Sequence, residues 1–250
     1  MLKSVPRSGT HKFYILIFEF YIDVQLLGVR IDNLTLEESL EKISGFLNDD
    51  QQYYIVTPNH DFLVLAQKDE EFCEILNKAG LSLPDGIGIV WAAKFLGRPL
   101  KERVAGIDLV EKLKDRNENL KIFLLGGEGG VAKKIASNWK AVVGYTEDKD
   151  KAVDLINQTK PNLLLVALGA PKQEKWIAQN LTLVPSVKVA IGVGGAFNFL
   201  SGKIRRAPKW LQKLGLEWLW RTLYERGRWI KFWRSVVVFP ILVLKEKFKL

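Results

Sequence analysis

Two hydrophobic patterns alternate along the chain. Short, unbroken apolar runs typical of buried strands are separated by stretches in which apolar residues recur at helical spacing. The predicted strands cover residues 22–27, 53–57, 81–83, 121–125, 162–168 and 187–193. The predicted helices cover residues 35–47, 60–78, 87–96, 107–116, 131–140, 150–159 and 172–180. This alternation predicts an α/β fold in which helices cover both faces of a parallel sheet.

One predicted helix carries its own start signal. Thr35 stands just before the helix, and Glu38 follows three residues later. This spacing is the capping box, in which each side chain accepts a hydrogen bond from the other residue's backbone N–H. It predicts that the helix begins directly after Thr35.

The pattern changes after Pro208. From there one stretch carries an apolar stripe and a cationic stripe at helical spacing. The stripes contain Trp210, Leu214, Trp218 and Leu219 on one side and Arg221, Arg228 and Lys231 on the other. We therefore divide the chain into an N-terminal extension (1–20), an α/β core (21–205) and a helical C-terminal appendage (206–250).

Residues 1–20 stay outside the fold prediction. Basic residues precede an apolar run there, as in a signal peptide, but Glu19 interrupts the run and no cleavage site follows. We interpret the segment as a loose extension or the product of a mis-set start codon. No run in the chain reaches the roughly 20 apolar residues of a transmembrane helix. Any membrane contact is therefore predicted to be peripheral.

Cysteine and histidine are scarce in this sequence. Cys73 is the single Cys, and His11 and His60 are the two His. One Cys cannot form an internal disulfide, and two His cannot by themselves build the usual zinc sites. These counts argue against a disulfide scaffold and a His/Cys metalloenzyme, and they predict a reducing compartment.

The formal net charge of +9 is concentrated at the C-terminal end. Residues 201–250 hold 13 of the 37 Lys and Arg residues, 3 of the 28 Asp and Glu residues and five of the eight Trp residues. Cationic and aromatic side chains together favour an anionic membrane surface, where Trp lies at the headgroup level. A nucleic-acid partner and a solvated basic helix face are the alternatives.

The residues that carry chemistry stand where predicted strands end. They are Thr57-Pro58-Asn59, Pro84-Asp85-Gly86, and the segments 126–130, 169–174 and 192–195. Because the carboxyl ends of parallel strands meet at one edge of a sheet, we expect these residues to line one pocket. This pattern predicts a site without identifying its ligand.

Polar side chains at two of these strand ends have alternative interpretations. Asp85, between Pro84 and Gly86, could act as a general base or could cap the helix that follows. Lys172 and Gln173 open a later helix. They could donate hydrogen bonds to a phosphate or sugar oxygen, or they could face solvent.

Two further motifs are weaker. Residues 127–132 fit the G-x-G-x-x-G/A pattern that holds phosphates, but Glu128 opposes a diphosphate. We therefore favour a structural or nucleotide-binding turn over a nicotinamide site. Asp148-Lys149-Asp150 matches the D-x-D metal motif of some sugar transferases, although the charged first turn of a helix is our preferred interpretation. Without a metal, a departing diphosphate needs Arg or Lys.

Several segments together resemble the WecG/TagA/CpsF family of glycosyltransferases. They are TPN at 57–59, PDGIGIV at 84–90, RVAGIDL at 103–109, LGAPKQEKW at 168–176, GVGGAFNFLSGKIRRAPKWLQKLGLEWLWR at 192–221 and the basic tail. They follow one another in the family's order from about Leu26 to Arg234. Chance does not account for so long a shared block.

The resemblance implies a Rossmann-like core with a C-terminal appendage. It also implies metal-independent, inverting transfer of a sugar from a UDP-sugar, with no cofactor. The implied acceptor is N-acetylglucosamine diphospho-undecaprenol, and the implied donor is UDP-N-acetylmannosamine, in teichoic acid or related surface-polysaccharide synthesis. The alternatives are UDP-N-acetylmannosaminuronic acid or another UDP-hexose in capsule or common-antigen pathways, and a non-catalytic scaffold.

The resemblance also implies a place in the cell and a set of partners. It indicates a cytoplasmic protein that binds peripherally to the inner face of the bacterial plasma membrane. Nucleic acid is not an expected partner. The sequence leaves open whether the chain forms a homo-oligomer.

By the same resemblance, Asp85 matches the family's proposed general base. The matching pocket and appendage residues are Thr57, Asn59, Arg103, Gln173, Arg221, Arg228 and Lys231. The two appendage arginines are implied to close over the diphosphate, with Lys231 where a third arginine often stands. Because the appendage also carries the membrane-binding features, docking on lipid would complete the active site. We expect a chain without it to keep a folded core and lose turnover.

The chain departs from the family's pattern at three places. Asn198 stands where the family often has Asp, which predicts an altered donor pocket. Residues 141–147 are short for the family's strand and loop, which predicts that one strand of the sheet is missing or reduced. Lys231 offers a point charge in place of a bidentate arginine.

Overall fold

The computed structural model describes residues 23–249, except 117, 214–216, 218 and 221–228. The predicted extension (1–20) lies outside the described residues, as do Arg221 and Arg228. The described chain opens with an antiparallel hairpin of β1 (Asp23–Leu26) and β2 (Val29–Asp32). The strand predicted at 22–27 is β1, whereas its partner was not predicted. Its two-residue turn needs positive φ at Leu27 and Gly28, and leucine is not a usual turn residue.

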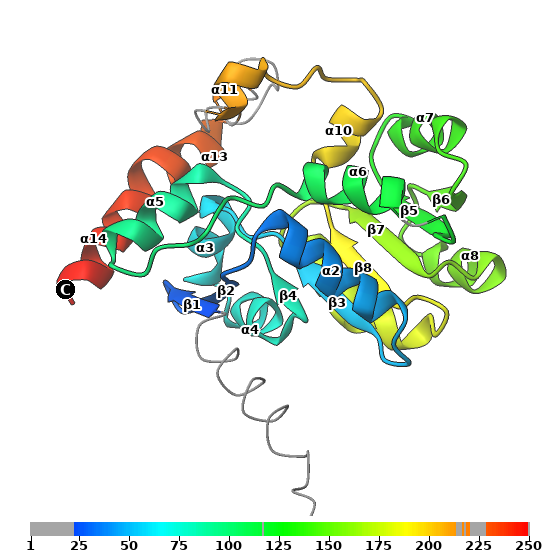
Figure 1. The fold of residues 1–250 in the computed structure, drawn as a ribbon, viewed down its shortest axis with the longest axis horizontal. Helices are drawn as coiled ribbons and strands as arrows, with labels where there is room; N and C mark the ends of the chain where they lie inside the picture. The colour runs from blue at the N-terminus through cyan, green and yellow to red at the C-terminus, as the bar shows by residue number, and fades with distance from the viewer. Residues whose placement is uncertain (1–22, 117, 214–216, 218, 221–228, 250) are drawn as a thin grey trace, which may run out of the picture.

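Six parallel strands form the main sheet, in the order β4–β3–β8–β7–β5–β6 (Figure 1). The strands are β3 (Tyr53–Val56), β4 (Leu81–Ser82), β5 (Ile122–Gly126), β6 (Val142–Thr146), β7 (Leu163–Ala167) and β8 (Val189–Gly192). The predicted parallel α/β architecture is confirmed. The expectation of a missing or reduced strand at 141–147 was wrong, because β6 pairs with β5 as an edge strand and has five residues, as β5 and β7 do. Its residues alternate between half-buried and exposed, so the apolar run is weak.

Helices connect the strands and cover the sheet. They are α2 (Leu36–Leu47), α3 (His60–Ala66), α4 (Glu70–Lys78), α5 (Ile87–Phe95), α6 (Gly106–Arg116), α7 (Val131–Asn138), α8 (Ala152–Thr159), α9 (Lys172–Asn180), α10 (Ala196–Leu200) and α11 (Lys209–Lys213). The capping box of α2 is confirmed, with reciprocal bonds between Thr35 and Glu38. The single helix predicted over 60–78 is two helices, because the Asp69 side chain caps a new helix start.

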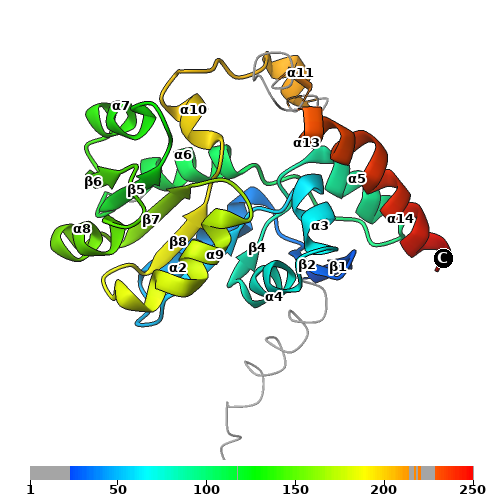
Figure 2. The ribbon, with the colours of Figure 1, turned by 180° about the vertical axis from the view of Figure 1, so that it is seen from behind.

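The side chains of each central strand alternate between two hydrophobic layers. In β5, Ile122 and Leu124 pack in the layer that holds α2, α6 and α7, whereas Phe123 and Leu125 pack with α8 and α9. Figure 1 shows α2 in front of the sheet, and Figure 2 shows α9 in front. The sheet is therefore buried on both faces, as its unbroken apolar runs predict.

The C-terminal helices pack on the rest of the fold. The run of α13 (Trp229–Trp233), the π-helical η2 (Arg234–Val238) and α14 (Phe239–Phe248) lies beside α5 in both views (Figures 1 and 2). Phe239 and Val243 are buried in one cluster with residues of β1, α3 and α5. The backbone N–H of Leu27 donates to Glu246 at 2.7 Å. The described helices of the predicted appendage thus share a hydrophobic core with segment 21–205.

Candidate active site

A cavity of about 400 Å³ opens at the carboxyl ends of β3, β4, β7 and β8. Its size is typical of ligand pockets. Six of the eight predicted site residues line this first cavity: Thr57, Asn59, Asp85, Arg103, Gln173 and Lys231. Arg221 and Arg228 lie outside the described residues. The structure therefore brings together every predicted site residue that it describes, from segments far apart in the sequence.

Thr57 and Asn59 hold the wall of the first cavity that follows β3. The Thr57 hydroxyl donates to the carbonyl of Gly192 at 3.2 Å and so ties the ends of β3 and β8 together. Asn59 is the N-cap of α3, where its side-chain oxygen accepts the N–H groups of Asp61 and Phe62. The Asn59 oxygen is thus used by the fold, and its amide NH2 group is the part that suits a ligand.

Asp85 is the acid at the end of β4. The N-cap of α5 is Gly86, so Asp85 is not the capping residue of this helix but the residue before it. Gly86 has a φ of 151°, a conformation that L side chains rarely adopt. A methyl group on Gly106 would lie 3.5 Å from the Thr57 hydroxyl and 3.8 Å from Asp85 Oδ2. Gly106, the first residue of α6, therefore lies near both oxygens, at distances that an ordinary van der Waals contact would allow.

Arg103 belongs to an ion-pair network that sequence reasoning missed. Its guanidinium lies 3.7 Å from a carboxylate oxygen of Glu217, and Glu217 also binds Arg206 at 3.3 Å. Arg206 further bonds Asp108 on α6. Glu217 is buried and lines the first cavity. Its one sequence signal is that it is an acid in a strongly basic segment.

Gln173 and Glu174 are both buried at the start of α9. The solvent-facing alternative is therefore wrong for Gln173, which lines the first cavity, whereas Lys172 is exposed. The Gln173 side-chain oxygen accepts the N–H groups of Gly169 and Gly194, and its NH2 group donates to Glu174. Burial raises the pKa of Glu174 to about 7.

The C-terminal helices supply the outer wall of the first cavity. Lys231, Ser235, Val236 and Phe239 line it, and the Phe239 ring centre lies 6.2 Å from that of His60. Arg234 pairs with the buried Asp61 of α3 at 3.1 Å. Lys231 was expected at this site through the family resemblance, whereas the Arg234–Asp61 pair joins residues 173 positions apart and follows from no local pattern.

A second cavity of about 360 Å³ lies beyond the ends of β5 and β7. It shares Gly169, Gly194 and Gly195 with the first cavity, and Glu128, Glu147, Asn198 and Lys203 also line it. In the glycine loop, a methyl group on Gly127 would lie 2.5 Å from Val131, so this close turn requires glycine. The N–H of Gly130 donates to Glu147 at 2.7 Å. Because Glu147 already binds the N–H of Gly130, this loop has one backbone N–H group fewer for a phosphate than its G-x-G-x-x-G/A pattern predicts.

The D-x-D motif forms a turn rather than the first turn of a helix. The N–H of Asp150 donates to Asp148 Oδ1 at 3.0 Å, and α8 begins only at Ala152. Over the described ranges, no three His, Cys, Asp or Glu side chains gather as metal ligands would. In the same part of the chain, no helix is long and apolar enough to cross a membrane.

The fold and the two cavities define an α/β enzyme with its site at the carboxyl edge of a parallel sheet. The Glycosyl transferase WecG/TagA/CpsF family model matches residues 24–250, and the chain belongs to this family of glycosyltransferases.

Two curated relatives carry the name N-acetylglucosaminyldiphosphoundecaprenol N-acetyl-beta-D-mannosaminyltransferase. The protein from Bacillus subtilis (strain 168) is 34% identical over 205 residues, which are 77% of this chain and 79% of the relative. The protein from Staphylococcus aureus (strain MRSA252) is 34% identical over 241 residues, which are 91% of this chain and 94% of the relative.

Proposed function

We propose that the protein transfers N-acetylmannosamine from UDP-N-acetylmannosamine to N-acetylglucosamine diphospho-undecaprenol. Both relatives are named for N-acetylmannosaminyl transfer to this lipid, and they match most of the chain. The observation that carries the proposal is the lining of the first cavity, where the carboxylate of Asp85 and the cation of Arg103 share one space. The product would enter teichoic acid or related surface-polysaccharide synthesis.

Asp85 is the general base in this proposal. Its carboxylate takes the proton from the acceptor's sugar hydroxyl as that oxygen attacks the anomeric carbon of the donor. The attack comes from the face opposite UDP, so the bond to the diphosphate breaks and the anomeric centre inverts. UDP leaves with the bonding electron pair, and the proton stays on Asp85.

Cationic side chains stabilise the departing diphosphate in this proposal, without a metal ion. Arg103 and Lys231 line the first cavity, and Arg221 and Arg228 would join them by family resemblance. Fixed cations aimed at developing negative charge are an effective form of transition-state stabilisation. Glu217, 3.7 Å from Arg103, holds that guanidinium in place before a diphosphate arrives.

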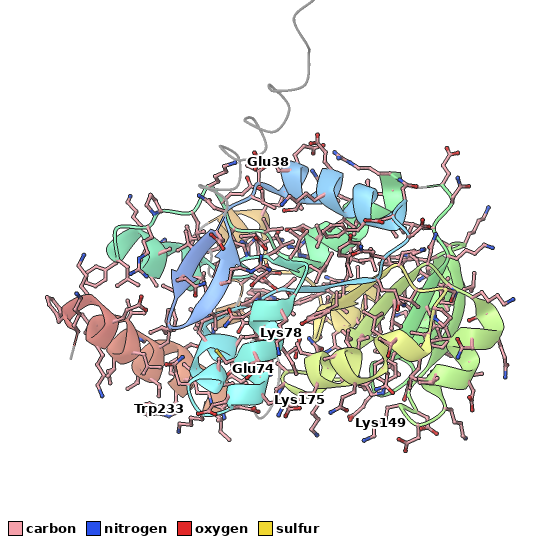
Figure 3. The ribbon with its side chains drawn as sticks, turned by 90° about the horizontal axis from the view of Figure 1, so that it is seen from below. Glu38, Glu74, Lys78, Lys149, Lys175 and Trp233 are labelled. Carbon is pink, nitrogen blue, oxygen red and sulfur yellow. The ribbon has the colours of Figure 1, made fainter. Side chains whose placement is uncertain are left out.

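We further propose that the protein binds peripherally to the inner face of the plasma membrane. Exposed apolar side chains recur at helical spacing on the outer side of α13 and again on that of α14. They are Ile230, Trp233, Ile241, Leu244 and Phe248. Figure 3 shows Trp233 at the outside of this run. Exposed lysines lie between them, and this combination suits an anionic lipid surface.

UDP release by the purified protein tests the transfer. The assay supplies UDP-N-acetylmannosamine and a short-chain N-acetylglucosamine diphospholipid, with EDTA present. We expect release that needs the acceptor, and we expect Asp85→Asn to lower kcat by roughly 100- to 10,000-fold, as loss of a general base does. The matched control is Asp148→Asn, which changes an exposed acid outside both cavities and should leave the rate unchanged.

Other outcomes separate the alternatives. Loss of activity with EDTA, or in Asp148→Asn, would contradict metal-independent transfer. UDP release only with UDP-N-acetylmannosaminuronic acid or another UDP-hexose would make that sugar the donor. Asn198 in the second cavity would then be the first residue to substitute in a test of donor choice. If no donor gives UDP release, the alternative of a non-catalytic scaffold protein is favoured.

A further inference from the structure

The side-chain amide of Gln173 connects two loops that lie between the two cavities. The Gln173 oxygen accepts the N–H of Gly169 at 3.2 Å and the N–H of Gly194 at 3.1 Å. These glycines belong to the loops after β7 and β8, and each lines both cavities. The position of this amide therefore sets how far apart the two loops lie.

Glu174 binds the other end of that amide and so supports its orientation. The Gln173 NH2 group donates to Glu174 Oε1 at 2.6 Å. A reversed amide would point NH2 at two N–H donors and its oxygen at a carboxyl oxygen, which removes all three hydrogen bonds. The amide therefore makes all three hydrogen bonds in one orientation only, with its oxygen bound by the two glycine N–H groups and its NH2 group bound by Glu174 Oε1.

Glu174 is expected to lower the stability of the fold. Its side chain is fully buried, and its Oε2 atom has no hydrogen-bond partner among the described residues. A buried carboxyl with an unsatisfied oxygen destabilises the fold, and an apolar side chain of similar volume is often better tolerated. Such violations of local packing rules are expected at functional sites.

The surrounding backbone is shaped around this carboxyl. A methyl group on Gly192 would lie 2.7 Å from Glu174 Oε1 and 2.8 Å from Gln173 Nε2. Real side chains do not approach so closely, so glycine at this position of β8 makes room for the pair. The Gly192 carbonyl also accepts the Thr57 hydroxyl, which connects the pair to the β3 side of the first cavity.

We propose that Glu174 is a positioning residue, which holds the Gln173 amide so that the loops after β7 and β8 keep the spacing that the active site needs. Glu174 acts through Gln173 and does not line either cavity. This proposal rests on the proposed function only where it is tested by enzyme activity; the hydrogen-exchange test below does not need that function.

Three variants of α9 test this role. Glu174→Met keeps a similar volume and removes the acceptor, and we expect an unchanged or higher Tm with a kcat lower by roughly 10- to 100-fold, because misplaced site groups cost about this much. Glu174→Gln restores an acceptor oxygen and should recover most of that rate. Gln179→Met, at an exposed position of the same helix, is the control and should match wild type.

A double-mutant cycle shows whether Glu174 acts through Gln173. In a Gln173→Ala background, Glu174→Met should lower the rate no further, because the amide it orients is gone. An equal further loss in that background would overturn the proposal. Wild-type kcat in the Met variant would also overturn it.

Amide hydrogen exchange provides a readout that needs no activity. We expect faster exchange at Gly169 and Gly194 in Glu174→Met, with the other strand-end amides unchanged. Unchanged protection of both glycines would overturn the proposal, whatever the assay shows. If wild type turns over no donor, the proposed function fails while this exchange experiment still tests Glu174.

Discussion

At the residue scale, the polar side chains of the first cavity serve the fold and the site at once. The Asn59 side-chain oxygen accepts hydrogen bonds at the start of α3, and the Thr57 hydroxyl donates its proton to the carbonyl of Gly192. Both residues line the first cavity, and each has further hydrogen-bonding capacity beyond these contacts. The site is therefore held rigidly by the bonds that end its strands and begin its helices, a form of preorganisation that favours catalysis.

The buried carboxyl of Glu174 predicts a pH-dependent stability. Its pKa rises from an ordinary value of 4.5 to about 7 in the folded protein, because burial disfavours the charged form. The folded state therefore binds this proton more tightly, and stability falls as the pH rises through the interval between the two values. Glu174→Gln removes this titration. We expect the variant's free energy of unfolding, relative to wild type, to grow by about 3 kcal/mol from pH 4 to pH 8.

Urea denaturation of both proteins across this pH range measures the difference. Gln179→Glu, which places a carboxyl on the exposed side of α9, is the control and should show little of this trend. A constant difference between wild type and Glu174→Gln would contradict the raised pKa.

At the element scale, the C-terminal helical run has two distinct sides. Phe239 and Val243 face α3 and the hairpin, whereas Ile241, Leu244 and Phe248 are exposed. A chain cut before residue 206 would therefore lose membrane features and core packing together. Single substitutions on either side separate these roles better than truncation does.

Phe239→Ala tests the inward side. Phe239 is 5% exposed, and we expect its loss to lower the free energy of unfolding by about 3–5 kcal/mol, because a buried ring leaves a cavity. Phe248→Ala, at a position 63% exposed, should change stability by less than about 0.5 kcal/mol. Chemical denaturation measures both, and equal losses would mean that α14 does not dock as described.

At the scale of the whole molecule, charge and exposed apolar surface coincide. The last 50 residues carry all of the excess positive charge. Their run of α13, η2 and α14 lies beside α5, which exposes Trp91 and Phe95. Lys247 lies 5.5 Å from the Phe95 ring centre, so the two elements meet at this surface. Residues of the same elements, among them Trp91 and Lys231, line the first cavity, so under the proposed function this surface is the one to test for membrane binding.

Vesicle co-sedimentation tests this surface. We expect binding to phosphatidylglycerol vesicles that weakens with salt. We expect Ile230→Ser/Ile241→Ser to weaken it by at least roughly tenfold, because two apolar side chains that would enter the lipid are lost. Leu183→Ser, an exposed apolar position outside the C-terminal run, is the control and should bind as wild type does. Stronger binding to duplex DNA than to the vesicles would instead favour the nucleic-acid alternative.

The sequence by itself determined the features that depend on short-range patterns. The α/β alternation, the capping box of Thr35 and Glu38 and the placement of Thr57, Asp85 and Gln173 at strand ends all follow from periodicity and local spacing. The hairpin partner β2 and the edge strand β6 escaped prediction, because a leucine at a tight turn and a half-exposed edge strand give weak local signals.

Only the tertiary structure decided the long-range contacts. The pairing of Glu217 with Arg103, the docking of Phe239 on α3 and the burial of Glu174 join or enclose residues through surfaces that no local pattern specifies. A carboxyl at the start of a helix reads as a solvent-exposed residue that favours the helix dipole. Its burial, and hence its raised pKa and its role beside Gln173, exists only once β8 and α9 have packed together.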